Sequence, residues 1–174
     1  SPEYKSRFEA DLKKQLPRVP FARDFWAFSK AGRELAYWHL NYETVDPWPL
    51  QQMGELDLGD SALYRVQKMA WARKRVDGKL TDDKTTLIYN SRITLGGIPP
   101  EALDYIVNGK PAIEWIIERY QVTTDKDSGI VNDPNDWATE HDDPAYILNL
   151  VKRIVRVSVE TVRIVKSLPA LQEL

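Results

Sequence analysis

The side chains best suited to chemistry in this chain are cations gathered between residues 65 and 79. This stretch has six basic residues against one acidic residue, Asp77, and therefore a net charge of +5. Cations at this density bind phosphates by releasing condensed counterions, so this basic strand-turn element, which also carries Trp71, could lie along a phosphate backbone. The stretch predicts contact with DNA or RNA, and a solvated hairpin tip is the alternative interpretation. Its cations are Arg65, Lys68, Arg73, Lys74, Arg75 and Lys79.

A short polar stretch follows at residues 90–92, where the sequence reads Asn-Ser-Arg. The amide of an asparagine matches the hydrogen-bonding edge of adenine, and a guanidinium group matches that of guanine. Asn90 and Arg92 are therefore predicted to read base edges if the neighbouring strands enter a groove of DNA. An ordinary turn is the alternative interpretation.

Residues 121–143 have the opposite charge, with seven acidic residues against one lysine and a net charge of −6. Their Asp, Asn, Ser, Gly and Pro residues favour tight turns and local hydrogen bonds. A calcium loop does not fit, because Gly129 is the fifth residue of such a loop instead of the sixth, and Asp136 replaces its twelfth-position glutamate. We expect a solvated loop held by bonds from side chains to the backbone.

No catalytic or metal-binding constellation is recognisable in the sequence. The chain has no cysteine, and its two histidines, His39 and His141, have no partner at a catalytic or metal-ligand spacing. Residues 46–49 (DPWP) and 133–137 (DPNDW) both fail the residue order of the adenine methyltransferase motif. A glycine-rich phosphate loop is also missing. We therefore expect a non-catalytic domain that binds no metal or cofactor itself.

Composition predicts one globular domain over residues 1–174. Hydrophobic residues make up 43% and charged residues 29% of the chain, and the net charge is −2, so contact with a nucleic acid requires a local patch. No apolar run approaches the ~20 residues that span a membrane, and no signal sequence opens the chain. These features favour a cytoplasmic monomer. The first residue, Ser1, is not a methionine, so we expect a piece of a longer protein.

Periodicity predicts an α+β fold, with helices at both ends around a small, mainly antiparallel sheet. Strands are expected near residues 63–67 and 85–95, with a turn at Asp77-Gly78 and a break at Asn90-Ser91. Residues 44–59 are expected to form a loop. The helices are predicted at residues 1–16, 21–42, 99–107, 111–120 and 143–168, of which 21–42 should be largely buried and 143–168 is the long C-terminal helix.

Several segments resemble the C-terminal specificity domain of Type ISP restriction-modification enzymes, which are large single-chain bacterial proteins often labelled putative helicases. The resemblance extends across nearly the whole chain. The central segments are residues 105–110 (YIVNGK), 114–122 (EWIIERYQV) and 124–137 (TDKDSGIVNDPNDW). The outer segments are residues 7–12 (RFEADL), 16–21 (LPRVPF), 40–43 (LNYE), 157–162 (VSVETV) and 168–169 (LP).

This resemblance implies a domain that recognises a sequence in double-stranded DNA. In such enzymes a nuclease, a motor and an N6-adenine methyltransferase precede it, so ATP, magnesium and S-adenosylmethionine would serve other parts of the parent chain. The methyltransferase domain would then be a second partner. The alternative is an internal docking domain that holds the methyltransferase or the motor and reads little DNA. Exposed apolar surface on Trp115 or on the helix after Asp143 would favour that alternative.

Overall fold

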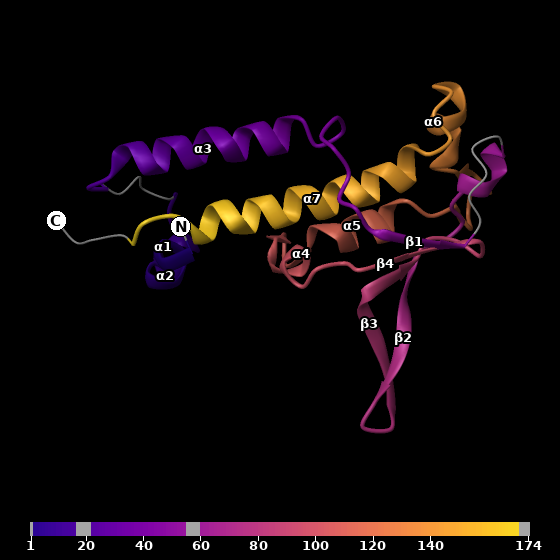
Figure 1. The fold of residues 1–174 in the computed structure, drawn as a ribbon, viewed down its shortest axis with the longest axis horizontal. Coiled ribbons are helices and arrows are strands. Elements are labelled where there is room, and N and C mark those ends of the chain that lie inside the picture. Colours follow the sequence, from indigo (N-terminus) through magenta and orange to yellow (C-terminus); the bar gives the residue numbers. More distant parts are fainter. Residues whose placement is uncertain (1, 17–21, 55–59, 171–174) are drawn as a thin grey trace.

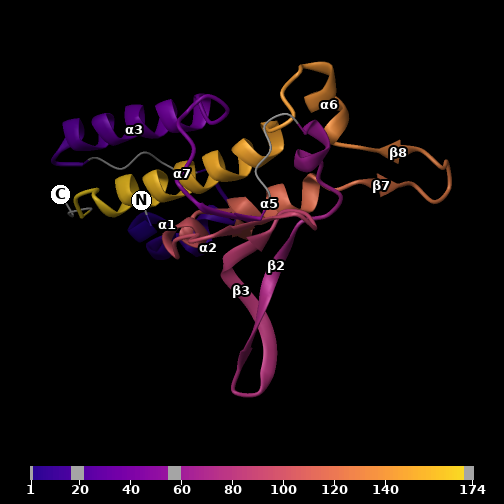
Figure 2. The same cartoon turned by 45° about the vertical axis from the view of Figure 1, so that its right-hand side comes forward.

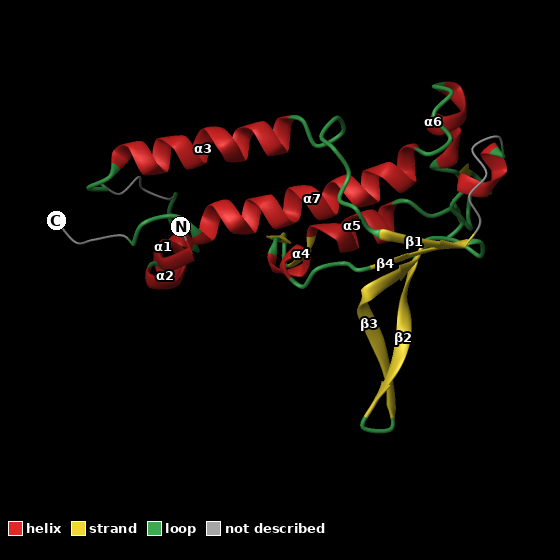
Figure 3. Ribbon diagram, viewed as in Figure 1, coloured by secondary structure: helices red, strands yellow, loops and turns green. Residues whose placement is uncertain are grey.

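The chain folds into an α+β structure, as the sequence predicts, with helices around a small antiparallel sheet (Figure 3). The computed structural model describes residues 2–16, 22–54 and 60–170. One long helix, α7 (Tyr146–Lys166), runs through the body of the molecule, with α3 (Phe25–Leu40) on one side and the sheet on the other (Figure 1). No helix among the described residues is long and apolar enough to cross a membrane.

The prediction of a long C-terminal helix is confirmed by α7. Val155, Val157 and Val159 alternate with polar residues as they would in a strand, yet the whole segment is helical. Ten side chains of α7 are buried, and this packing outweighs the modest helix propensity of β-branched residues. The helix ends before Ser167, two residues ahead of Pro169.

The main sheet has four antiparallel strands in the order β1-β4-β3-β2. The break predicted at Asn90-Ser91 is confirmed, because it separates β3 from β4. A Cβ atom at Gly54 would lie 1.9 Å from the carbonyl oxygen of Arg92, so only glycine permits this approach of β1 to the start of β4. The strands are β1 (Gln51–Gly54), β2 (Ala70–Val76), β3 (Lys79–Ile88) and β4 (Ile93–Gly96).

Strands β2 and β3 form a long hairpin that projects from the body, on the side of α7 away from α3 (Figures 1 and 2). The predicted turn is confirmed, since Asp77 (φ 49°) and Gly78 (φ 78°) both adopt the left-handed conformation that a two-residue hairpin turn requires. A bulge between Trp71 and Ala72 interrupts the pairing near the base.

Two predictions about strands are wrong. Residues 61–64 form a single 3-10 turn (η1, Ser61–Tyr64), because the Asp60 carboxylate accepts a bond from the Ala62 backbone and starts the turn. The alternation from Leu63 to Gln67 reflects burial of Leu63, Tyr64 and Val66 beneath the sheet and not pairing with a strand. The loop expected at residues 44–59 contains the strand β1, whose four residues are too few to show an alternation of apolar and polar side chains. Residues 55–59 lie outside the described part of the chain.

The core lies between the sheet, α7 and the helix α5 (Ala112–Arg119). The Tyr89 hydroxyl is fully buried and donates to the Tyr64 carbonyl at 2.6 Å, while burial raises the pKa of that hydroxyl. Burying an aliphatic side chain contributes about 1.5 to 3 kcal/mol, so this cluster fixes where the hairpin leaves the body. Its fully buried members include Leu63, Val66, Leu87, Ile93, Leu95, Ile113, Val151 and Val155.

The helix predicted at residues 99–107 is wrong in its second half. It is a single turn, α4 (Glu101–Asp104), followed by a small hairpin of β5 (Ile106–Val107) and β6 (Lys110–Pro111). The predicted left-handed residues Asn108 (φ 48°) and Gly109 (φ 88°) are confirmed as such, but they turn a hairpin instead of ending a helix. The following helix, α5, is confirmed.

The N-terminal helical segment is confirmed in part, because it divides at Phe8 into α1 (Pro2–Arg7) and α2 (Glu9–Leu12). Its predicted start at Ser1 and end at Pro17 lie outside the described residues. The next helix, α3 (Phe25–Leu40), is also confirmed, with the Asp24 carboxylate accepting from the Ala27 backbone at 2.9 Å.

The expectation that α3 is largely buried is wrong. Only Ala31 is buried, because α3 packs on α7 along one side and has no second layer above it among the described residues. The remaining elements form the acidic region, a second small hairpin followed by one more short helix. They are β7 (Thr123–Thr124), β8 (Val131–Asn132) and α6 (Asn135–Glu140).

Candidate nucleic-acid interface

The structure divides the eight predicted contact residues into two groups. Four lie on the projecting hairpin, which we call the recognition hairpin (β2, β3 and their turn). The other four lie where the chain enters and leaves the sheet, and we call this region the platform. The recognition hairpin carries Arg73, Lys74, Arg75 and Lys79, whereas the platform carries Arg65, Lys68, Asn90 and Arg92.

Arg73 and Lys74 lie further from the tip of the recognition hairpin than Arg75, and both are paired with acids of the opposite strand. Arg73 lies opposite Asp82, with 3.6 Å between Nε and Oδ1. Lys74 contacts Asp83 at 3.0 Å, and the hydrogen bonds from Thr85 and then from Lys74 lower the pKa of the Asp83 carboxyl. The net charge of +5 counted along the sequence therefore overstates the local charge, because β3 returns two acids to the same surface.

The two cations near the tip form no ion pair among the described residues. Arg75 lies opposite Leu80, and Lys79 lies opposite Val76, so the pairs occupy opposite faces of the ribbon. Leu80 is 54% exposed and Val76 is 45% exposed. Each face of the tip thus presents one cation beside one apolar side chain, a combination able to contact both a phosphate and the apolar edge of a base.

The base of the recognition hairpin is fixed to the body by Trp71 and Lys84. Trp71 is only 9% exposed, and the Lys84 ammonium lies 4.8 Å from the centre of its ring. The same ammonium contacts Glu114 of α5 at 2.9 Å. Trp71 is therefore not available for stacking on a base, and it contributes to packing at the base of the hairpin instead.

Asn90 uses both ends of its side-chain amide within the platform. The nitrogen donates to the carbonyl oxygens of Leu63 at 2.9 Å and Arg65 at 3.0 Å. The oxygen accepts from the backbone nitrogens of Arg92 at 2.9 Å and Ile93 at 2.8 Å. This pattern leaves the amide no donor for a base, and it holds the β3–β4 turn against the segment that precedes β2.

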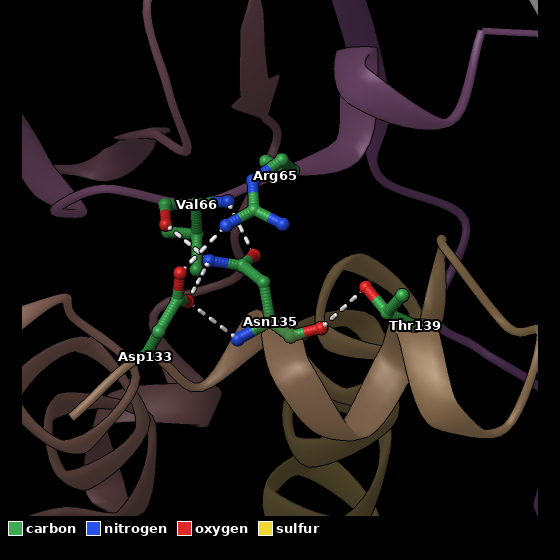
Figure 4. A network of polar contacts seen from close by, with 5 residues as sticks. All are labelled: Arg65, Val66, Asp133, Asn135 and Thr139. Carbon is green, nitrogen blue, oxygen red and sulfur yellow. Dashed lines mark hydrogen bonds and ion pairs between the residues drawn. The ribbon is translucent and has the colours of Figure 1, made fainter. Parts of the chain in front are cut away.

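Arg65 takes part in a polar network that joins the platform to the acidic region (Figure 4). Its guanidinium contacts the Asp133 carboxylate at 2.6 Å. Asn135, which is 3% exposed, accepts from the Val66 nitrogen and donates to the Val66 carbonyl, both at 2.8 Å. The Asn135 side chain therefore mimics a strand partner for Val66 and ties α6 to the start of the recognition hairpin.

Asp133 is the charged centre of this network. Burial alone would raise the pKa of its carboxyl, but hydrogen bonds from the backbone and side chain of Asn135 and the nearby Arg65 guanidinium lower that pKa below its usual value. Arg92 has a comparable contact with Asp60 at 3.0 Å. Lys68 is exposed and forms no ion pair within the described ranges.

The prediction that side chains of the acidic region bond to the backbone is confirmed at the turn of residues 125–129. The Asp125 carboxylate accepts bonds from the Ser128 and Asp127 backbone nitrogens, and the bonds from Ser128 lower the pKa of this carboxyl. No group of three or more His, Cys, Asp or Glu residues in the described part could hold a metal ion. His39 contacts the Tyr105 and Thr161 hydroxyls, and His141 stacks on Trp137.

Sequence reasoning missed the acids that decide which cations are available. The pairing of Arg73 with Asp82 follows once the two-residue turn fixes the register, so this signal was present in the sequence. The contact of Arg65 with Asp133 spans 68 positions and has no local signal. Asn135 gives no signal either, because an asparagine after a proline is common in loops.

Comparison with protein families finds one matching family model, described as the Type ISP C-terminal specificity domain, over residues 1–150. No curated protein matches the chain.

Solved structures give similar results. A nuclease-deletion mutant of the Type ISP restriction-modification enzyme LlaGI, in complex with a DNA substrate mimic, is 40% identical with a TM-score of 0.83 over 99% of this chain and 13% of that chain. The ATP-dependent Type ISP restriction-modification enzyme LlaBIII, bound to DNA, is 41% identical with a TM-score of 0.83 over 99% of this chain and 11% of that one. DrdV, in a complex with DNA, is 30% identical with a TM-score of 0.77 over 99% and 17%.

Proposed function

The chain belongs to the family of Type ISP C-terminal specificity domains, and from that premise we propose that it recognises a sequence in double-stranded DNA through its recognition hairpin. The related LlaGI, LlaBIII and DrdV structures were solved with DNA or a DNA mimic. This is a recognition role and not a catalytic one. The observation that carries the proposal is the projecting β2–β3 ribbon with Arg75 and Lys79 at its tip.

The dimensions of the recognition hairpin fit a DNA groove. Its shorter strand has seven residues, which at about 3.3 Å per residue span roughly 20 Å. The major groove is about 12 Å wide and 8.5 Å deep and admits a two-stranded β-ribbon. The ribbon can therefore reach the groove floor while the platform stays outside the phosphate backbone.

The two groups of predicted residues have different roles in this proposal. Arg75 and Lys79 contact phosphates or base edges directly, with Val76 and Leu80 against apolar base edges. Arg73 and Lys74 contact DNA only by exchanging their aspartate partners for phosphates, and Lys68 is a further phosphate contact. Arg65, Asn90 and Arg92 position the hairpin through the platform contacts described above.

The proposal extends to the setting of the domain. The chain spans only 11% to 17% of the length of these three solved chains. We place residues 1–174 as one specificity domain within a longer, monomeric, cytoplasmic restriction-modification enzyme. Its nuclease, ATP-dependent motor and adenine methyltransferase lie elsewhere in that polypeptide, and the methyltransferase shares the DNA with this domain.

The decisive experiment measures how DNA affinity depends on salt. The double variant Arg75→Ala/Lys79→Ala should reduce the slope of log affinity against log salt by about two units, because each lost phosphate contact removes about one released counterion. The control Lys14→Ala/Lys126→Ala removes the same charge from exposed sites away from the hairpin. Selection from a random duplex pool would then show whether the enriched site changes with the hairpin variant. Equal slopes and equal sites for both double variants would refute the proposal.

A further inference from the structure

Helix α3 presents an exposed stripe that the described residues leave uncovered. Its members recur at alternating intervals of four and three residues, so they lie on one side of the helix. Trp26 is 73% exposed, Tyr37 is 56% exposed and Leu40 is 82% exposed. We call this surface the α3 stripe, and it consists of Trp26, Lys30, Arg33, Tyr37 and Leu40.

The opposite side of α3 is already occupied. Leu35 and Trp38 are half-buried, and Ala31 is buried, on the side that packs against α7. His39 holds the end of the helix, because its Nε2 contacts the Tyr105 hydroxyl at 3.2 Å and the Thr161 hydroxyl at 3.3 Å. The helix is thus fixed in place, and folding of the domain does not require the α3 stripe to be apolar.

The residue types of the stripe are those of a protein interface. Trp, Tyr and Arg are enriched where truncation costs the most binding energy. A spacing that alternates between three and four residues is also the pattern that interdigitates with another helix. Lys30 and Arg33, near the middle of the stripe, bring positive charge, and the stripe itself has no acidic member. Lys30 lies 3.9 Å from Glu34 of the same helix, and the Arg33 guanidinium donates to the Ser29 hydroxyl, which leaves the charge of Arg33 without an acidic partner among the described residues.

We propose that the α3 stripe binds a helix of the same polypeptide from outside residues 1–174, whose apolar side chains are interleaved with Asp or Glu. This rests on the proposed function in one respect, that the domain belongs to a longer chain. In the three solved relatives the matching region is 11% to 17% of the polypeptide, so most of each chain is available to cover such a surface. The acidic side chains of the partner would pair with Lys30 and Arg33.

Charge and position argue against two other occupants. In a twofold pairing of two copies, the central cations of one stripe would face the same cations of the other, which is unfavourable. DNA held by the recognition hairpin lies on the other side of α7, because α3 and the hairpin project from opposite sides of that helix (Figures 1 and 2). Docking on α3 and DNA binding can therefore occur together.

The test places a photoactivated benzoylphenylalanine at Tyr37 in the full-length polypeptide and maps the cross-links by mass spectrometry. We expect an intramolecular cross-link from Tyr37 to an acidic amphipathic helix. The control carries the same group at Ile130, an exposed position (68%) on the β7–β8 hairpin. A yield at Tyr37 no higher than at Ile130 would overturn the proposal, as would a product of twice the mass or a cross-link to added duplex DNA.

A charge-reversal variant separates this proposal from the proposed function. Lys30→Glu/Arg33→Glu should lower the cross-link yield at Tyr37 roughly tenfold, since like charges then face each other. The DNA affinity of the 174-residue chain should not fall by the amount seen for Arg75→Ala/Lys79→Ala. An unchanged cross-link yield contradicts the acidic partner, whereas loss of DNA binding without loss of the cross-link bears only on the recognition hairpin.

Discussion

The recognition hairpin and the platform are built from the same kinds of residue, but three of the four platform residues are held by contacts within the domain, whereas the two cations at the hairpin tip form no ion pair among the described residues. Arg65, Asn90 and Arg92 are each held by contacts within the domain. Arg75 and Lys79 extend from a ribbon with no acid opposite them. Availability, and not residue type, distinguishes the proposed contact residues from the structural ones.

This difference follows from topology. The platform joins segments that are far apart in the sequence, so its polar side chains must satisfy buried backbone groups. The tip of a two-stranded ribbon has no neighbouring layer, so its side chains stay solvated. Polar residues at a junction are therefore expected to affect stability, and those at a tip are expected to affect binding.

The largest expected effect comes from shortening the recognition hairpin. Replacing residues 74–81 by Asn-Gly keeps the Arg73–Asp82 pair and a favoured turn. Affinity for the preferred DNA site should fall about 10³-fold, to the level of non-specific binding, because base contacts are lost. The melting temperature should change little, since every replaced residue is exposed.

The matched control shortens the acidic hairpin in the same way, with Asn-Gly joining Thr124 directly to Val131. Its affinity should be unchanged or slightly higher, because acidic residues are removed. Equal losses in the two shortened proteins, measured by fluorescence anisotropy, would show that the recognition hairpin has no special role.

The next largest effect is a loss of stability, which we expect for a platform variant and not for the shortened hairpin. Asn90→Ala should lower the free energy of unfolding by about 2 to 4 kcal/mol, because it leaves two carbonyl groups and two backbone nitrogens without their partner. Asn132→Ala, at an exposed position, is the control. Chemical denaturation measures both. A stable Asn90→Ala protein with relaxed sequence preference would instead assign Asn90 to base reading.

The features of the recognition hairpin and of the platform that depend on neighbouring residues could be predicted from local sequence signals. The Asp77-Gly78 turn and the break at Asn90-Ser91 each involve at most a few positions. The turn also fixes the register, so the pairing of Arg73 with Asp82 could have been predicted. The bulge at Trp71 and the network around Asp133 could not, because both depend on tertiary packing.

Burial was the least predictable property. Helix α3 has enough aromatic residues to suggest a core helix, yet Trp26 and Tyr37 face outward, because nothing in the sequence shows how many layers cover a helix. The helix α7 and the half-buried Trp115, whose indole donates to the Val107 carbonyl, lack the exposed apolar surface expected of a docking face. The α3 stripe has that surface instead.

A smaller effect tests whether Asp82 and Asp83 weaken DNA binding by the recognition hairpin. Asp82→Asn/Asp83→Asn should raise DNA affinity by roughly two- to fivefold, because exposed ion pairs are weak and Arg73 and Lys74 then contact phosphates without competition. Asp136→Asn/Glu140→Gln makes the same change in charge on α6. A similar gain in both proteins would indicate a general effect of charge and no specific role for the hairpin acids.

The smallest expected effect is a dependence of platform stability on pH. Because the pKa of Asp133 is lower in the folded state than its unfolded value of about 4, its ionised form contributes stability above that value, and the contribution disappears as pH falls toward the folded pKa. The difference in melting temperature between the native chain and Asp133→Asn should therefore shrink between pH 7 and pH 3. Arg65→Ala should reduce the same pH-dependent difference, since the guanidinium helps to lower the pKa. If this difference in melting temperature stays constant with pH, Asp133 stabilises the platform by hydrogen bonding alone, and the Arg65 guanidinium is available to contact a DNA phosphate.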